Sequence, residues 1–79
     1  MHYVYILKSQ KDNSHYIGSS SNLKNRIIAH NQNTVKSTKA KTPYIIKWYC
    51  AFPTKEKALI FEKYLKTGSG IAFYRKRFL

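Results

Sequence analysis

The chain has 79 residues, with 15 lysines and arginines against three acidic residues, a net charge of +12. This length predicts one domain, residues 1–79, near the lower size limit for folding without disulfides or bound metals. The single cysteine, Cys50, excludes an internal disulfide and a thiolate metal cluster. No apolar run approaches the roughly 18 residues of a membrane span, and no signal peptide is visible, so we expect a cytoplasmic protein without a membrane partner. The charge predicts binding to nucleic acid, but on charge alone a structural RNA-associated protein is an equally good interpretation.

The first twenty residues predict a β-hairpin. Residues 3–7 are aromatic and β-branched, residues 9–14 form a polar turn, and residues 15–18 resume the strand pattern.

Alternation along this hairpin separates two kinds of side chain. Val4, Ile6 and Ile17 point to one face, and Tyr5 and Tyr16 to the other. If the aliphatic face packs inward, the two tyrosines emerge together on the opposite face.

A helix is expected over residues 23–31, because residues 19–22 offer several N-cap side chains. Arg26 and His30 lie four apart in it and form a polar stripe beside an apolar one.

Residues 32–42 form a polar, lysine-bearing connector without periodicity. We expect it to be a mobile loop that touches a nucleic-acid backbone. Residues 44–52 are the longest apolar run and are expected to be the central strand.

Two further helices complete the pattern. A threonine N-cap precedes a helix over residues 55–66, residues 68–70 break the chain, and residues 71–79 predict a short basic helix anchored by Phe73 and Phe78. The element order indicates a small α+β sandwich.

Glu62 is one of only three acids and lies on the apolar stripe of the helix over residues 55–66. A buried carboxylate is costly unless it is paired or bound to a metal. An ion pair with a lysine or with Arg26 is one interpretation. A metal site is the other, and a lone carboxylate suits Mg²⁺, which keeps most of its waters, better than Zn²⁺. The residues themselves leave this choice open.

The tyrosine pair lies near Arg26 in the expected arrangement. A phenol has a pKa near 10, which nearby positive charge lowers, so such a tyrosine could take a proton from water. We expect the other tyrosines to serve packing or stacking.

These residues together resemble the signature of the GIY-YIG nuclease superfamily. The matching segments are Tyr-Val-Tyr at 3–5 (in place of Gly-Ile-Tyr), Tyr-Ile-Gly at 16–18, residues 22–26 with His30, and Glu62 within 61–66. The resemblance spans essentially the whole chain. It looks closest to small single-domain bacterial proteins related to the catalytic amino-terminal domain of the excision-repair incision subunit.

The resemblance implies a small three-stranded antiparallel sheet flanked by helices in the order β-β-α-β-α-α. It also implies hydrolysis of phosphodiester bonds with one divalent metal, Mg²⁺ or Mn²⁺. We therefore expect an endonuclease acting on DNA rather than RNA, in repair or in the processing of unusual structures.

Roles for individual residues follow from the resemblance. Tyr5 and Tyr16 would activate and orient the attacking water, with Tyr5 favoured as the base. Arg26 would clamp the scissile phosphate and Glu62 would hold the metal. His30 would hydrogen-bond a tyrosine or phosphate, or else be a solvated helix residue.

Nucleic-acid contacts are expected from Gly18, whose backbone would pass close to the substrate, and from four lysines: Lys24, Lys36, Lys39 and Lys66. A non-catalytic nucleic-acid-binding module on the same fold is the alternative function. The placement of an acid where phosphate would bind argues against it. The sequence predicts no oligomeric state.

Overall fold

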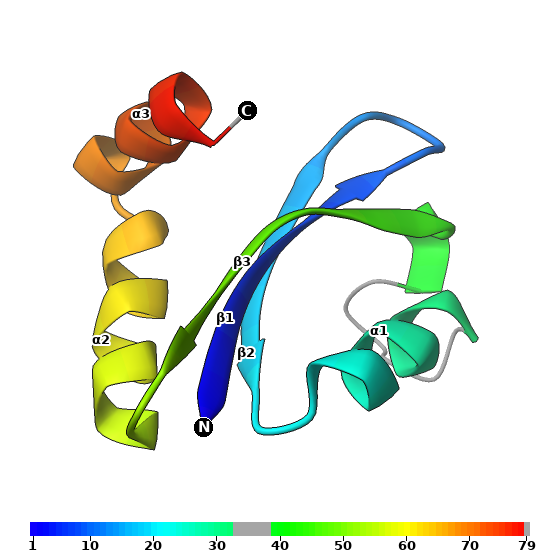
Figure 1. Ribbon diagram of the computed structural model, residues 1–79. Coiled ribbons are helices and arrows are strands. Elements are labelled where there is room, and N and C mark those ends of the chain that lie inside the picture. Colours follow the sequence, from blue (N-terminus) through cyan, green and yellow to red (C-terminus); the bar gives the residue numbers. More distant parts are fainter. Residues whose placement is uncertain (33–38, 79) are drawn as a thin grey trace.

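The protein is described by a computed structural model for residues 1–32 and 39–78. Its elements, in chain order, are β1 (His2–Ser9), β2 (His15–Ser20), α1 (Leu23–Asn31), the short 3₁₀ turn η1 (Lys39–Lys41), β3 (Tyr44–Phe52), α2 (Lys55–Leu65) and α3 (Gly68–Arg77). The three strands form one antiparallel sheet of order β2-β1-β3. Helix α1 lies on one side of this sheet, and α2 and α3 lie on the other (Figure 1). The α+β class and the order β-β-α-β-α-α expected from the sequence are confirmed.

The central strand is β1 rather than β3. β1 pairs with both other strands, and its residues Val4, Tyr5, Ile6 and Leu7 are all buried. β3 pairs only with β1 in the described chain and is exposed along most of its length. The prediction of residues 44–52 as the central strand is therefore wrong, because an apolar run indicates a strand without showing what covers it.

The aliphatic face of the hairpin packs inward, as expected. Val4, Ile6 and Ile17 form a core with Ala58 and Leu65 of α2. This core fixes α2 against the sheet and therefore fixes the position of its acidic residue, described below.

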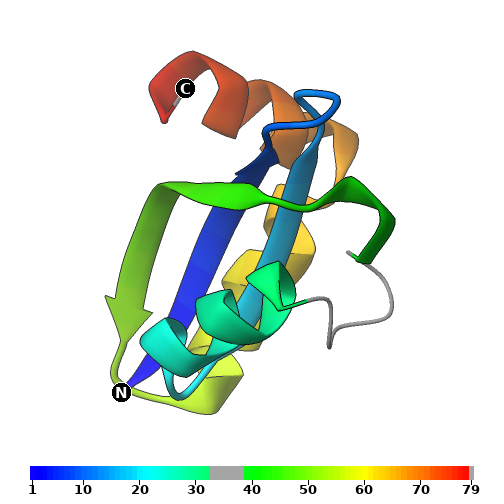
Figure 2. The same ribbon diagram turned by 90° about the vertical axis from the view of Figure 1, so that its right-hand side faces the viewer.

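The tyrosine face of the sheet is also covered. Tyr5, Leu7 and Tyr44 form a second buried cluster, against which Leu23 and Ile27 of α1 pack. Figure 2 views this face, with α1 lying in front of the strands. Tyr5 is consequently enclosed between the sheet and α1 instead of lying on an open surface.

Side-chain caps set the helix starts. Asn22 caps α1 by accepting from the Asn25 N–H, and Thr54 caps α2 by accepting from the Lys57 N–H. Thr67 does the same for α3, accepting from Gly70.

Helix α3 begins at Gly68, so residues 68–70 are its first turn and not the expected break. A Cβ on Gly70 would lie only 1.9 Å from the Tyr64 carbonyl oxygen, which shows how closely α3 starts against the end of α2. Of the two expected anchors, Phe78 packs flat on Trp48, with ring centroids 4.1 Å apart, whereas Phe73 remains 37% exposed. Tyr74, which is buried, takes the place of Phe73 in the core.

None of the helices in the described part of the chain has the length and apolar character to cross a membrane.

Candidate active site

Tyr5 lies at the centre of the sheet and connects it to α1. It pairs with Gly18 of β2 on one side and Tyr49 of β3 on the other, and only 1% of its surface is exposed. Its Oη lies 2.9 Å from Nε2 of His30 in a hydrogen bond. His30 is completely buried. Of the two interpretations of His30, the hydrogen bond to a tyrosine is therefore confirmed and the solvated helix residue is excluded.

His30 is the centre of an aromatic cluster. Its ring centroid lies 5.0 Å from that of Tyr16, 5.8 Å from Tyr5 and 6.1 Å from Tyr44. The Tyr5 and Tyr16 centroids are 6.5 Å apart, so the pair predicted to share a face does meet there. Tyr16 is only half-buried, and it is therefore the member of the pair that solvent can reach.

Burial dominates the titration of Tyr5. Burial raises the pKa of Tyr5 above the usual value, and the nearby Arg26 opposes this without reversing it. The expected lowering of this pKa by positive charge is therefore wrong. Tyr5 is a neutral phenol at physiological pH, because enclosure under α1 outweighs the guanidinium.

The donor and the acceptor of the Tyr5–His30 hydrogen bond can be assigned. The positively charged Arg26 lies near the Tyr5 oxygen, and the hydroxyl proton of Tyr5 is available to His30. Burial and the charge of Arg26 lower the pKa of His30, which favours the neutral imidazole with Nε2 as the acceptor.

Gly18 is explained by the same tyrosine. A Cβ at this position would lie 2.5 Å from the Tyr5 Oη and 2.7 Å from its Cζ. The absent side chain therefore makes room for the phenol of Tyr5, an intramolecular reason that the sequence did not reveal.

Glu62 approaches from α2 on the opposite side of the sheet. Ser19 Oγ donates to its Oε1 at 2.6 Å, and Lys66 Nζ donates to its Oε2 at 2.8 Å. Burial by itself would raise the pKa of Glu62, but the hydrogen bonds from Lys66 and Ser19 outweigh it and the pKa is lowered. The ion pair considered for this residue is thus present, with Lys66 and not with Arg26. The negative charge of Glu62 also raises the pKa of Tyr5, so the two groups interact electrostatically.

The donor set limits which metal could bind. The described residues contain no group of three or more His, Cys, Asp or Glu side chains that could hold an ion. A single ionised carboxylate, Glu62, does not fit a structural Zn²⁺ site. It does fit Mg²⁺ or Mn²⁺, which can keep several waters and share phosphate oxygens with a substrate.

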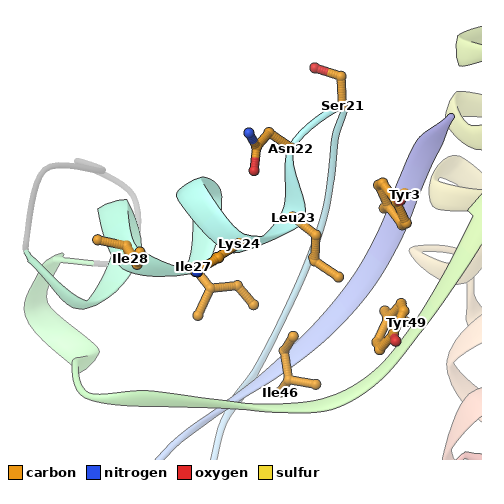
Figure 3. A pocket seen from close by; sticks show the side chains of 9 residues that line it. All are labelled: Tyr3, Ser21, Asn22, Leu23, Lys24, Ile27, Ile28, Ile46 and Tyr49. Carbon is orange, nitrogen blue, oxygen red and sulfur yellow. The ribbon is translucent and has the colours of Figure 1, made fainter.

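The three described lysines that are expected to contact nucleic acid belong to different elements, namely α1, η1 and the end of α2. Lys66 is paired with Glu62, Lys39 is exposed on η1, and Lys36 lies outside the described residues. Lys24 lines a groove of about 720 Å³. Figure 3 shows this groove between α1 and strands β1 and β3, with mostly apolar walls. Neither Tyr5 nor Arg26 lines it, so this groove is distinct from the tyrosine cluster.

Two positioning residues were missed by the sequence reasoning. Ser19, which holds Glu62, was considered only as an N-cap, although alternation from Ile17 would have placed it on the α2 face. Asn31 ties the end of α1 to the start of β3, because its side chain accepts from the Tyr44 N–H at 2.7 Å and donates to the Tyr44 carbonyl at 3.1 Å. No local pattern indicated that contact.

Comparison with known proteins matches residues 1–71 to the family described as the GIY-YIG catalytic domain. A UPF0213 protein of Staphylococcus haemolyticus is 41% identical over 69 residues, covering 86% of this chain and 83% of the relative. A UPF0213 protein of Clostridium perfringens is 42% identical over 67 residues, covering 84% of this chain and 71% of the relative. No solved structure matches the chain.

Proposed function

The chain belongs to the GIY-YIG family, whose catalytic domain implies a nuclease-type function, and from this premise we propose that it is a divalent-metal-dependent endonuclease. Its proposed substrate is DNA, in repair or in the processing of unusual structures. The observation that carries the proposal is the cluster in which Tyr5 hydrogen-bonds to the buried His30 beside Tyr16, with Arg26 close enough to act electrostatically on both Tyr5 and His30. Glu62 is held by Ser19 and Lys66 on the other side of the sheet.

Water activation is assigned to the tyrosines, with one change from the sequence expectation. A general base must touch the proton that it takes, and Tyr5 is almost fully enclosed. We therefore assign contact with the attacking water to the half-buried Tyr16. Tyr5 becomes a positioning residue that fixes His30 through their hydrogen bond and lies near Arg26.

Phosphate binding is assigned to Arg26, whose guanidinium can hold two phosphate oxygens and offset the charge that develops in the transition state. Its charge acts on Tyr5 and His30, so it lies beside the tyrosine cluster. Glu62 would hold the divalent ion, which when bound polarises the phosphate and stabilises the leaving oxygen.

A non-catalytic nucleic-acid-binding module is the second candidate, and the net charge of +12 favours it. Glu62 argues against this module, because a carboxylate repels phosphate, but its ion pair with Lys66 fits either candidate.

Cleavage assays with matched variants separate the two candidates. The wild-type protein is incubated with nicked, flapped, branched and single-stranded DNA, and with RNA, in Mg²⁺ or Mn²⁺. Glu62→Gln should reduce cleavage to background, whereas Glu56→Gln, which removes the same charge from the exposed first turn of α2, should retain it. At saturating DNA, Arg26→Met should reduce the rate by about 100-fold or more, whereas Lys24→Met, an expected nucleic-acid contact on the same helix, should weaken DNA binding without a comparable loss of this rate.

Cleavage that survives Glu62→Gln or Arg26→Met would show a contaminating nuclease and refute the assignment. Salt-sensitive binding with no cleavage of any substrate would support the binding module instead.

A further inference from the structure

Both carboxylate oxygens of Glu62 already have partners. Oε1 accepts from Ser19 and Oε2 accepts from the ammonium of Lys66 at 2.8 Å. The side chain of Glu62 is only 17% exposed, whereas that of Lys66 is 53% exposed. The carboxylate of Glu62, which is the metal ligand in the proposed function, is therefore paired with the ammonium of Lys66 at the end of the same helix.

A divalent ion and this ammonium compete for one carboxylate. Mg²⁺ binds an oxygen at about 2.0–2.1 Å and keeps an ordered shell of other ligands, which the Lys66 ammonium would crowd and repel. Lys66 is the C-cap residue of α2, with a long and largely solvated side chain. It can leave Glu62 without disturbing the core.

A second set of neighbours is available to Lys66. Its side chain also lines a hollow of about 280 Å³ with His15, Tyr16, Ile71 and Tyr74. Tyr16 belongs both to this hollow and to the aromatic cluster around His30, so the two sites adjoin. Three cations, Arg75, Lys8 and Lys47, act electrostatically on His15, so the surroundings favour an anion.

We propose, on the premise of the proposed function, that Lys66 is an exchange residue. It neutralises Glu62 when no metal is bound. When a divalent ion takes Glu62, Lys66 is released toward the hollow beside Tyr16 and binds a backbone phosphate next to the scissile one. Metal and nucleic acid then favour each other's binding, because each draws Lys66 and Glu62 apart.

Metal affinity without nucleic acid gives the first test. Binding of Mn²⁺ is followed by loss of the free-ion signal in electron paramagnetic resonance. Lys66→Met should tighten Mn²⁺ binding by about fivefold, the upper range for a partly exposed ion pair. Lys63→Met removes the same charge three residues earlier in α2 and leaves the Lys66–Glu62 pair intact. Its Mn²⁺ affinity should stay within about twofold of the wild-type value.

Nucleic-acid affinity gives the second test. In the Tyr16→Phe background, in which the proposed function removes cleavage, binding of a labelled nicked duplex is measured by fluorescence anisotropy with and without Mn²⁺. Adding Lys66→Met should weaken binding about threefold or more with Mn²⁺ and leave it nearly unchanged without metal. The control Lys63→Met should have the same effect in both conditions.

The outcomes separate this inference from the function on which it rests. If Glu62→Gln leaves Mn²⁺ binding unchanged, the metal assignment itself is wrong and the exchange falls with it. If Glu62→Gln abolishes Mn²⁺ binding but Lys66→Met matches wild type, only the exchange is wrong. Equal weakening of DNA binding by Lys66→Met with and without metal would make Lys66 a fixed phosphate contact and would also overturn the exchange.

Discussion

Gly18→Ala tests how tightly the candidate site is built. The added Cβ would lie 2.5 Å from the Tyr5 Oη, 2.7 Å from the Tyr5 Cζ and 3.0 Å from the Tyr16 Cε1. Tyr5 cannot simply swing aside, because it is 1% exposed and bonded to His30. The variant must therefore either displace the phenol or separate β2 from β1.

The magnitude follows from these contacts. Overpacking of a buried site costs about 1–3 kcal/mol, and loss of the Tyr5–His30 hydrogen bond costs about 1 kcal/mol. Alanine lowers the entropy of the unfolded chain and returns about 0.4–1 kcal/mol. We expect a net loss of roughly 2–3 kcal/mol in the free energy of unfolding. For a domain of this size that lowers Tm by about 10–20 °C.

Urea unfolding followed by Trp48 fluorescence measures this loss. Gly68→Ala is the matched control, because no atom beyond its chain neighbours and its own helix backbone lies within 4 Å of the added Cβ. It should change stability by less than about 1 kcal/mol. Combining Gly18→Ala with Tyr5→Phe removes the nearest clashing atom, so the two losses should be less than additive. An unchanged midpoint for Gly18→Ala, or an equal loss in Gly68→Ala, would refute the reasoning.

Three further predictions follow from the cluster and the charge. Tyr16→Phe should slow cleavage by about 100-fold or more and leave DNA affinity within about twofold of wild type. Tyr5→Phe should also lower stability by about 1 kcal/mol, because His30 Nε2 loses its buried hydrogen-bond partner. Wild-type cleavage by Tyr16→Phe would return the base role to Tyr5. Folding lowers the pKa of His30, so the contribution of this residue to stability is present above the unfolded pKa near 6.5 and is lost as pH falls through the lower folded value. Urea unfolding at pH 7 and pH 5 should therefore show that His30→Phe loses less unfolding free energy on acidification than wild type does. An identical loss in both proteins would contradict this assignment. Nucleic-acid affinity should fall steeply with salt. Lys24→Ala and Lys39→Ala should each reduce the slope of log K against log[salt] by about 1, because each lysine is expected to contact a phosphate. Unchanged slopes would exclude these lysines from the interface.

The element pattern was predictable where local signals agreed. Alternation placed Tyr5 and Tyr16 on one face, and the expected bounds of α1, residues 23–31, are those observed. The threonine cap before α2 was also identified correctly. The start of α3 was not predicted, because glycines 68 and 70 were interpreted as helix breakers. Thr67 is in fact the N-cap of a helix whose first turn contains both glycines.

What the sequence did not predict depends on contacts between distant elements. The raised pKa of Tyr5 requires α1 to cover the sheet, a fact that no segment contains alone. The sequence did not indicate which of the many lysines pairs with Glu62. Lys66 is selected because it lies four residues after Glu62 at the end of α2. The charge of Arg26 acts on Tyr5, in agreement with the expected placement of the tyrosine pair beside Arg26.

The exposed edge of β3 has a consequence for how the protein behaves in concentrated solution. Ile45, Ile46 and Tyr49 are all at least 38% exposed, and Lys47 is the strand's one charged side chain. Such an edge is a template for pairing with another chain. Mutual repulsion between copies of charge +12 opposes that pairing at low salt. Its range shrinks from about 10 Å at 0.1 M salt to about 3 Å at 1 M. The high salt used to strip nucleic acid from a basic protein will therefore also remove its main protection against aggregation.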